Sequence, residues 1–254
     1  MKKVVRDILK SIRSQPRRFK KALQRRLIAR GYGKWKKLIH NERDFMVAIS
    51  GALDRLLAVE SKDTLGDYLE FGVSRGTSMA CVHHVLRERG LDRMRQIGFD
   101  SFQGLPPEAA KEGWVPGRYA STTRATRHYL KANGVDLKQV TLVKGWFSDT
   151  LNERTRAQFG IKKASVLMLD CDIYAATKEA LAFALPLVRK RAVLIFDDWG
   201  WRSDRNMIGQ REAYEECVIA PGLFSVEPLR GYIPQSRLFL ISRRSLGADW
   251  PAQQ

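Results

Sequence analysis

Residues 67–78 read DYLEFGVSRGTS, a short apolar run that ends in a glycine-containing turn. Gly72 and Gly76 allow the backbone to turn tightly, and the hydroxyl residues after them can cap a following helix. A strand that passes through such a turn into a helix is typical of open parallel sheets, whose ligands bind at the carboxyl ends of the strands. The turn is not the G-x-G-x-x-G fingerprint of dinucleotide-binding proteins, because Ser74 occupies the position of the second glycine.

The same alternation of strand and helix continues through the rest of the chain. Strands are expected at Asp67–Val73, Arg95–Asp100, Val140–Lys144, Ala164–Asp170, Ala192–Asp197, Phe224–Pro228 and Arg237–Ser242, and helices at Ser78–Arg89, Thr122–Ala132, Asn152–Phe159, Ala175–Val188 and Arg205–Cys217. Strict alternation favours a parallel sheet, and the last two strands can close it as a hairpin. We therefore predict an α/β fold with a mostly parallel seven-stranded sheet that has helices on both faces.

Basic residues are concentrated at the start of the chain. The 254 residues carry 45 Lys and Arg against 27 Asp and Glu, a net charge of +18, and residues 1–40 alone contribute +14. Apolar residues recur in this segment at helical spacing, so we predict a basic helical N-terminal extension, residues 1–40, and one larger domain, residues 41–254. Such an extension can pack on the domain, attach to an anionic membrane or an acidic partner, or bind nucleic acid. Nucleic acid is less favoured, because aromatic residues are not interleaved with the basic ones.

The composition also excludes several classes of protein. Apolar residues make up 44% of the chain, which is enough for one sizeable core. No apolar run approaches the roughly 20 residues of a transmembrane helix, and charges interrupt the region where a signal peptide would have its apolar core. Cys81, Cys171 and Cys217 lack zinc-site spacing and indicate reduced thiols. We expect a cytoplasmic protein, and peripheral attachment to the inner face of the membrane stays open.

Carboxylates directly follow three of the predicted strands. Asp100 ends the second strand, where it can accept hydrogen bonds from a ribose diol, although a turn or capping role explains it as well. Asp170 and Asp172 follow the fourth strand, and Asp197 and Asp198 follow the fifth. If these two strands are neighbours, the carboxylates converge and repel one another unless a divalent cation or nearby arginines compensate. Oxygen-only ligands suit Mg²⁺, Mn²⁺ or Ca²⁺.

Five motifs in this order resemble the macrocin O-methyltransferase (TylF-like) family of class I S-adenosylmethionine-dependent methyltransferases. The motifs are Tyr68–Val73, Phe99–Pro106, Gly145–Leu151, Asp170–Tyr174 and Asp197–Asp198, within residues 66–242. The resemblance implies a Rossmann-like sheet, S-adenosylmethionine (S-adenosyl-L-methionine) as cofactor, Mg²⁺, and methyl transfer to a hydroxyl of a sugar or glycosylated natural product. On this basis, residues 41–254 are expected to form a class I methyltransferase domain.

The resemblance also implies roles for individual residues. The implied metal ligands are Asp170, Asp197 and Asp198. The implied cofactor contacts are Glu70, Gly72, Gly76, Asp100 and Ser148. After the first metal aspartate, catechol-type enzymes keep a base lysine that is absent from this chain. We therefore consider Asp172 first as the general base, or Asp170 as a shared ligand and base.

The acceptor pocket is expected above the strand ends. The connection Leu105–Ser121 is long enough to form a lid, and it carries Trp114, Arg118 and Tyr119. Residues 199–202, Trp-Gly-Trp-Arg, directly follow the acidic pair of the fifth strand. Aromatic and arginine side chains suit a sugar or another polar ring, including one with a phosphate or carboxylate, although packing on the domain explains the tryptophans as well.

Two other functions compete with the methyltransferase hypothesis. The first is a nucleic-acid-binding protein on a methyltransferase-like scaffold, which would use the basic arm to contact phosphates. The second is a nicotinamide-dependent oxidoreductase, which the glycine spacing and the acidic cluster disfavour. The sequence also leaves open whether the chain forms a homo-oligomer.

Overall fold

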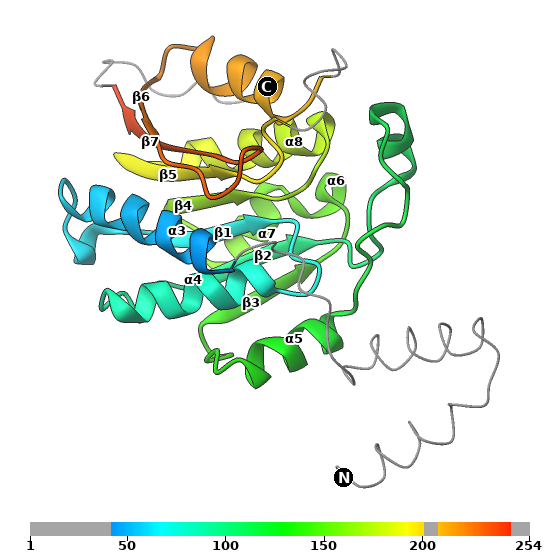
Figure 1. Cartoon of the computed structure of the whole chain (residues 1–254), viewed down its shortest axis with the longest axis horizontal. Coiled ribbons are helices and arrows are strands. Elements are labelled where there is room, and N and C mark those ends of the chain that lie inside the picture. Colours follow the sequence, from blue (N-terminus) through cyan, green and yellow to red (C-terminus); the bar gives the residue numbers. More distant parts are fainter. Residues whose placement is uncertain (1–41, 201–207, 245–254) are drawn as a thin grey trace, which may run out of the picture.

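The run Asp67–Phe71 forms β1, near the middle of a sheet with the order β3-β2-β1-β4-β5-β7-β6. The computed structural model describes residues 42–200 and 208–244 (Figure 1). The other strands are β2 (Gln96–Asp100), β3 (Val140–Lys144), β4 (Ala164–Leu169), β5 (Arg191–Phe196), β6 (Phe224–Leu229) and β7 (Arg237–Arg243). Strands β1 to β5 are parallel, whereas β7 pairs antiparallel with both β5 and β6. The predicted fold class is therefore confirmed.

Helices cover both faces of this sheet (Figure 1). The α-helices are α3 (Glu42–Leu57), α4 (Thr77–Glu88), α5 (Thr123–Ala132), α6 (Phe147–Thr150), α7 (Glu153–Phe159), α8 (Tyr174–Ala184) and α9 (Gln210–Tyr214). The shorter turns are the 3₁₀ segments η2 (Lys62–Thr64), η3 (Pro107–Glu112) and η4 (Leu185–Leu187), and the π-helix η6 (Glu215–Ile219).

Alternation along the strands divides the core into two layers. In β1, Tyr68 packs in the cluster with α3 and α4, whereas Leu69 and Phe71 pack in the cluster with α8 and α9. Successive side chains of a strand point to opposite faces, so both faces of a central strand must be apolar. This requirement explains why β4 and β5 form almost continuous apolar runs in the sequence.

The structure differs from the predicted elements in several helical segments, and the short α6 is among those not predicted. Helix α3 was not predicted, although Phe45, Ile49 and Leu53 recur at helical spacing and are buried. The helix predicted at Ala175–Val188 ends as α8 at residue 184 and continues as η4, whose proline lacks the N–H that an α-helix would need. In the described part of the helix predicted at Arg205–Cys217, α9 begins at Gln210 and η6 follows it.

Some sequence predictions lie outside this description. The proposed extension, residues 1–40, is not among the described residues, and neither are Trp201 and Arg202. Among the helices of residues 42–200 and 208–244, none is both long enough and apolar enough to cross a bilayer.

Candidate functional site

A cavity of about 820 Å³ lies at the carboxyl ends of β1, β2, β4 and β5. Its wall includes the turn after β1, the connection 101–121, the start of α6, and the connection between β6 and β7. Its volume falls in the usual range for small-molecule sites, and its place at the strand ends is the one expected for an open α/β sheet.

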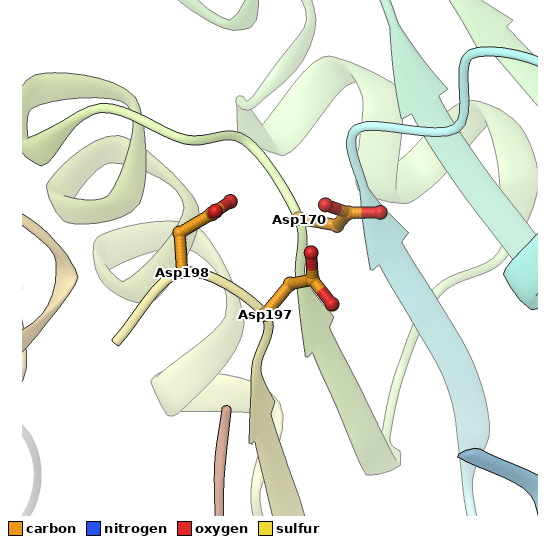
Figure 2. Close-up of side chains that lie close together, drawn as sticks. All are labelled: Asp170, Asp197 and Asp198. Atoms are coloured by element: carbon orange, nitrogen blue, oxygen red, sulfur yellow. The ribbon is translucent and has the colours of Figure 1, made fainter. Parts of the chain in front are cut away.

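Three carboxylates meet at one wall of this cavity. One oxygen from each of Asp170, Asp197 and Asp198 lies within 4.8 Å of the others. Figure 2 shows the three side chains extending from the ends of β4 and β5 toward a common space. The convergence follows from the sheet, because β4 and β5 are parallel neighbours with Leu169 paired to Phe196.

Burial and mutual repulsion make this acidic group costly to ionise. Burial raises the pKa of Asp170 well above its ordinary value, and the charges of Asp197 and Asp198 raise it further. The pKa of Asp198 is raised well above the ordinary value in the same way, by burial first and then by Asp172 and Asp197. A divalent cation would relieve this repulsion, and the all-oxygen donor set fits Mg²⁺ or Mn²⁺.

Two residues that sequence reasoning missed hold the acidic group in place. The Tyr232 hydroxyl, from the connection between β6 and β7, donates a hydrogen bond to Asp197 Oδ1. The buried side chain of Gln210 accepts a hydrogen bond from the Asp198 N–H at 3.0 Å. Gln210 lies 12 residues after Asp198 and Tyr232 lies 35 residues after Asp197, and no local sequence pattern links these pairs.

Asp172 also reaches the cavity, in an unusual backbone conformation. Its φ is 64°, in the left-handed region, and it lines the cavity beside Asp170. Burial raises the pKa of Asp172 well above its ordinary value, followed by the charges of Asp170 and Asp197. The candidate base therefore shares the space of the candidate metal ligands.

The four non-glycine residues with positive φ in the described chain are Ser74, Phe102, Tyr119 and Asp172. Three of them line the cavity, and Phe102 directly follows a lining residue. A non-glycine residue in this region is uncommon, and such strained residues cluster at functional sites. The strain therefore singles out the same place as the carboxylates do.

Position 72 requires glycine, because the backbone of Asp170 approaches it closely. Its φ is 91°, and a Cβ at this position would lie 1.8 Å from the carbonyl oxygen of Asp170. Any side chain would therefore push β1 away from the strand that carries the first candidate ligand. Gly72 lines the cavity, as expected of a cofactor contact. Gly76 does not; its φ is 79°, and it packs against Thr126 and Leu130 of α5.

Asp100 lines the cavity, but its carboxylate already has three backbone partners. Oδ2 accepts hydrogen bonds from the N–H groups of Val73 at 2.8 Å and Ser74 at 2.7 Å, and Oδ1 accepts one from Phe102 at 2.5 Å. A carboxylate has about four acceptor positions, so its capacity to bind a ribose diol is reduced. The structure gives Asp100 the turn-stabilising role, which the sequence had offered as the alternative.

Glu70 lies behind the cavity wall, not on it. Its side chain is fully buried and accepts hydrogen bonds from the hydroxyls of Tyr68 at 2.5 Å and Ser78 at 2.6 Å. Burial raises the pKa of Glu70 from 4.5 to about 7, although these hydrogen bonds act in the opposite direction. Because Glu70 is not part of the lining, any influence on a cofactor passes through the glycine turn and α4. Ser148, in α6, does line the cavity.

The connection 101–121 forms an arm beyond the strand ends, drawn in green in Figure 1. Leu105, Ala109 and Trp114 pack against Ile173 at the start of α8. Glu112 accepts a hydrogen bond from the Tyr174 N–H at 2.8 Å and so caps α8, whose own N-cap residue makes no side-chain cap. The arm is therefore attached to the segment that follows Asp170 and Asp172.

The tryptophan after the acidic pair belongs to the core instead of the cavity. Trp199 packs in an aromatic group with Phe196, Tyr214 and Phe239, at ring-centroid distances of 5.4, 4.9 and 5.2 Å. It is not part of the cavity lining. The expectation that Trp199 contacts an acceptor is replaced by the packing role, because this aromatic group fills the space beside β5.

Comparisons with known proteins agree with this arrangement. The profile of the family described as macrocin O-methyltransferase (TylF) matches residues 49–217, which include β1 to β5 and every aspartate of the site. The chain belongs to the TylF family.

Two curated relatives are 30% identical to this chain over the residues that they match. One is the 8-demethyl-8-(2,3-dimethoxy-alpha-L-rhamnosyl)-tetracenomycin-C 4'-O-methyltransferase of Streptomyces olivaceus, matched over 152 residues, 56% of each chain. The other is the demethyldecarbamoylnovobiocin O-methyltransferase of Streptomyces niveus, matched over 146 residues, 53% of each chain. The chain thus matches about half the length of these relatives.

Solved structures show the same fold. The O-methyltransferase NovP superposes with a TM-score of 0.63 at 20% identity, covering 87% of this chain and 88% of that one. CalS11, a calicheamicin methyltransferase, superposes with a TM-score of 0.58 at 21% identity, covering 91% and 94%. At this level of identity, the likeness supports the fold alone.

Proposed function

We propose that the protein transfers a methyl group from S-adenosylmethionine to a hydroxyl oxygen of a sugar in a glycosylated natural product, with Mg²⁺ in the site. The observation that carries this proposal is the convergence of Asp170, Asp197 and Asp198 on a cavity that begins at the glycine turn after β1. Membership of the TylF family supports the reaction class. The rhamnosyl group in the name of the Streptomyces olivaceus relative supports a sugar-bearing acceptor.

The residues present fit the cofactor. Gly72 offers a turn without a side chain, and Asp100 and Ser148 add polar groups to the same part of the cavity. Asp100 still has room for about one further hydrogen bond, and its charge suits a cationic sulfonium compound. When bound, S-adenosylmethionine supplies the methyl group, and the protein contributes mainly by aligning the acceptor oxygen with it.

The residues present also fit a divalent cation. Asp170, Asp197 and Asp198 would hold it, and Tyr232 would keep the Asp197 carboxylate oriented through its hydrogen bond. When bound, such a cation lowers the pKa of a hydroxyl that it contacts. This assistance matters because a sugar hydroxyl is a weak nucleophile at neutral pH.

Asp172 is the proposed acceptor of the hydroxyl proton, with Asp170 as the alternative. Asp172 lines the cavity, and its left-handed backbone directs it to the space that it shares with Asp198. Proton transfer requires hydrogen-bond reach, and the place of Asp172 in the cavity lining supports this role. A cation among the three ligands would favour the ionised form of Asp172 and prepare it to accept the proton.

The charge of the wall favours a neutral acceptor over a phosphorylated one. Within the described part of the chain, Arg118 is the only cationic lining residue, whereas Glu108 and Glu179 add carboxylates to those at the strand ends. An acceptor phosphate would meet this negative field. We therefore favour a glycoside whose sugar is uncharged, placed between Trp114 and Tyr119 and the acidic group.

The test combines binding and turnover. Calorimetry is expected to show binding of S-adenosylhomocysteine and no binding of NAD. Mass spectrometry with a panel of rhamnosides and other glycosides is expected to detect methylation that EDTA suppresses and Mg²⁺ restores. Binding of NAD with no binding of S-adenosylhomocysteine would overturn the proposal, and turnover unaffected by EDTA would overturn the role of the metal.

A further inference from the structure

Gln210 is a buried amide that joins the ends of β4 and β5. Its side chain is completely inaccessible to solvent. Nε2 donates a hydrogen bond to the Leu169 carbonyl at 3.1 Å, and Oε1 accepts one from the Asp198 N–H at 3.0 Å. Leu169 directly precedes Asp170. One side chain therefore contacts the backbone next to one candidate metal ligand and the backbone of another.

These contacts lie where the pairing of the two strands ends. The last paired residues are Leu169 and Phe196, and the Asp197 N–H donates one further hydrogen bond to the Leu169 carbonyl at 3.2 Å. Through its two hydrogen bonds, the Gln210 side chain links the same Leu169 carbonyl to the next residue of the other strand, Asp198. A buried amide is costly unless its donor and acceptor are both bonded, and here both are bonded to the site's own backbone.

The helix that carries Gln210 is itself firmly held. Gln210 is the first residue of α9, and Glu212 accepts a hydrogen bond from the N–H of Gly209 at 2.7 Å. Tyr214, in the same helix, packs against Phe196 and stacks on Phe239, with ring centroids 5.7 and 4.7 Å away. The Gln210 amide is thus positioned by the core, independently of any ligand.

We propose that Gln210 is a positioning residue that sets the separation between the Asp170 and Asp198 carboxylates, and with it the affinity for the cation. This inference rests on the proposed metal role of the acidic group. Groups that support metal ligands commonly change metal affinity by about 10-fold to 100-fold when they are replaced. Gln210 acts through backbone groups, so we place its effect at the lower end of this range.

Gln210→Met tests the inference, because methionine keeps the length of the side chain and removes both hydrogen bonds. Gln96→Met is the matched control. Gln96 is also completely buried, donates to the Met79 carbonyl and contacts His83, yet it does not line the cavity. We expect thermal stability to fall in both variants. The Mn²⁺ dissociation constant, measured by electron paramagnetic resonance, should rise about tenfold in Gln210→Met alone.

Gln210→Asn provides a second variant if the methionine enzyme does not fold. It keeps a buried amide but is one methylene too short to reach both partners, so the same loss of Mn²⁺ affinity is expected. An unchanged Mn²⁺ affinity in the folded Gln210 variants overturns the inference. Equal weakening in Gln96→Met also overturns it, because the effect would then be one of general stability.

The experiment separates this inference from the proposed function. S-adenosylhomocysteine binding is measured on the same samples and should not change in any variant. A wild-type protein that binds S-adenosylhomocysteine but not Mn²⁺ would remove the metal role, and this inference with it, while the methyltransferase proposal would stand. A wild-type protein that binds Mn²⁺ while the Gln210 variants bind it equally well would remove this inference alone.

Discussion

At the scale of single residues, the site is held together against its own electrostatics. Asp170, Asp172, Asp197 and Asp198 share one wall, and burial together with their mutual charge raises the pKa of Asp170, Asp172 and Asp198. A protein gains no stability from such a group on its own. The arrangement is reasonable only if a positively charged ligand is bound there during function, which is the usual compromise between stability and activity.

Replacing one of these aspartates should therefore have opposite effects with and without metal. We expect Asp198→Asn to raise the melting temperature in EDTA by about 2–4 °C, equivalent to about 1 kcal/mol for a chain of this size, because repulsion falls. In Mg²⁺, the variant should lose metal-stimulated turnover and the stabilisation by metal. Asp170→Asn should show the same rise of melting temperature in EDTA and the same loss of the response to Mg²⁺. Calorimetric scans with and without Mg²⁺, and assays of methylation, measure these effects.

The control is Asp149→Asn, which alters an exposed carboxylate of α6 that lies outside the cavity lining. It should leave both the melting temperature and the response to Mg²⁺ unchanged. S-adenosylhomocysteine should bind every variant as it binds the wild type. If Asp198→Asn lost cofactor binding and metal response together, the separate metal role would be contradicted.

Glu70 gives a prediction for pH. Its pKa is raised from 4.5 to about 7, so the folded state favours the protonated form. Its favourable contribution is complete below pH 4.5 and is lost as the pH rises through 7, and the difference corresponds to up to about 3 kcal/mol. Glu70→Gln cannot ionise, so we expect the variant to gain stability relative to wild type between pH 5 and pH 8.

Urea denaturation at the two pH values measures this difference. Glu88→Gln, an exposed glutamate on α4, is the control and should follow the wild type at both. A Glu70→Gln protein that parallels the wild type across the range would show that the buried carboxyl does not titrate there.

At the scale of elements, the arm 101–121 closes one side of the cavity through few contacts. Glu112 caps α8, the cluster of Leu105, Ala109, Trp114 and Ile173 packs beside it, and the Ser74 hydroxyl donates a hydrogen bond to the Tyr119 carbonyl at 2.8 Å. A side-chain cap contributes about 1 kcal/mol. Its loss would therefore shift the equilibrium between the attached and the detached arm about fivefold toward the detached state. If the arm acts as the lid expected from the sequence, Glu112 is one of the side chains that hold it in place.

We expect Glu112→Ala to raise the KM for the acceptor several-fold while the affinity for S-adenosylhomocysteine changes little. Amide hydrogen exchange in residues 105–119 should become faster. Lys111→Ala, at an exposed position in the same 3₁₀ segment, is the control and should change neither quantity. Unchanged exchange in Glu112→Ala would contradict the importance of the cap.

The elements themselves could largely be predicted, because each central strand must be apolar on both faces. The apolar runs at β4 and β5 can be recognised in the sequence for that reason, and the carboxylates that follow them mark the sheet edge. The four-residue α6 was too short for periodicity to reveal. The contacts of Gln210 and Tyr232 with Asp198 and Asp197 depend on tertiary packing, and no local pattern encodes them. For Glu70 the motif predicts a cofactor contact, and the structure adds that its side chain is buried behind the cavity lining.

At the scale of the whole molecule, most of the net charge lies outside the residues found to line the cavity. Residues 1–40 carry +14 of the +18 net charge, whereas the lining found within residues 42–200 and 208–244 runs from Gly72 to Gln235. We propose on this ground that residues 41–254 bind the cofactor without the basic segment.

Deletion of residues 1–40 should leave S-adenosylhomocysteine affinity unchanged and lower the salt concentration needed for elution from heparin, since the net charge falls from +18 to +4. Binding to anionic vesicles and to RNA, each measured over a range of salt, distinguishes the partners of the segment. Loss of cofactor affinity in the shortened protein would contradict the proposed division of the chain.

The insertion of β7 between β5 and β6 has a consequence for biosynthesis. β6 pairs with β7 alone, and β7 also covers the outer side of β5. A nascent chain that has left the ribosome only as far as β6 therefore has an unpaired strand and an uncovered sheet edge, both of which invite association between copies. The sheet can be completed only after residues 237–243 have been synthesised. Premature termination upstream of them should therefore yield insoluble protein.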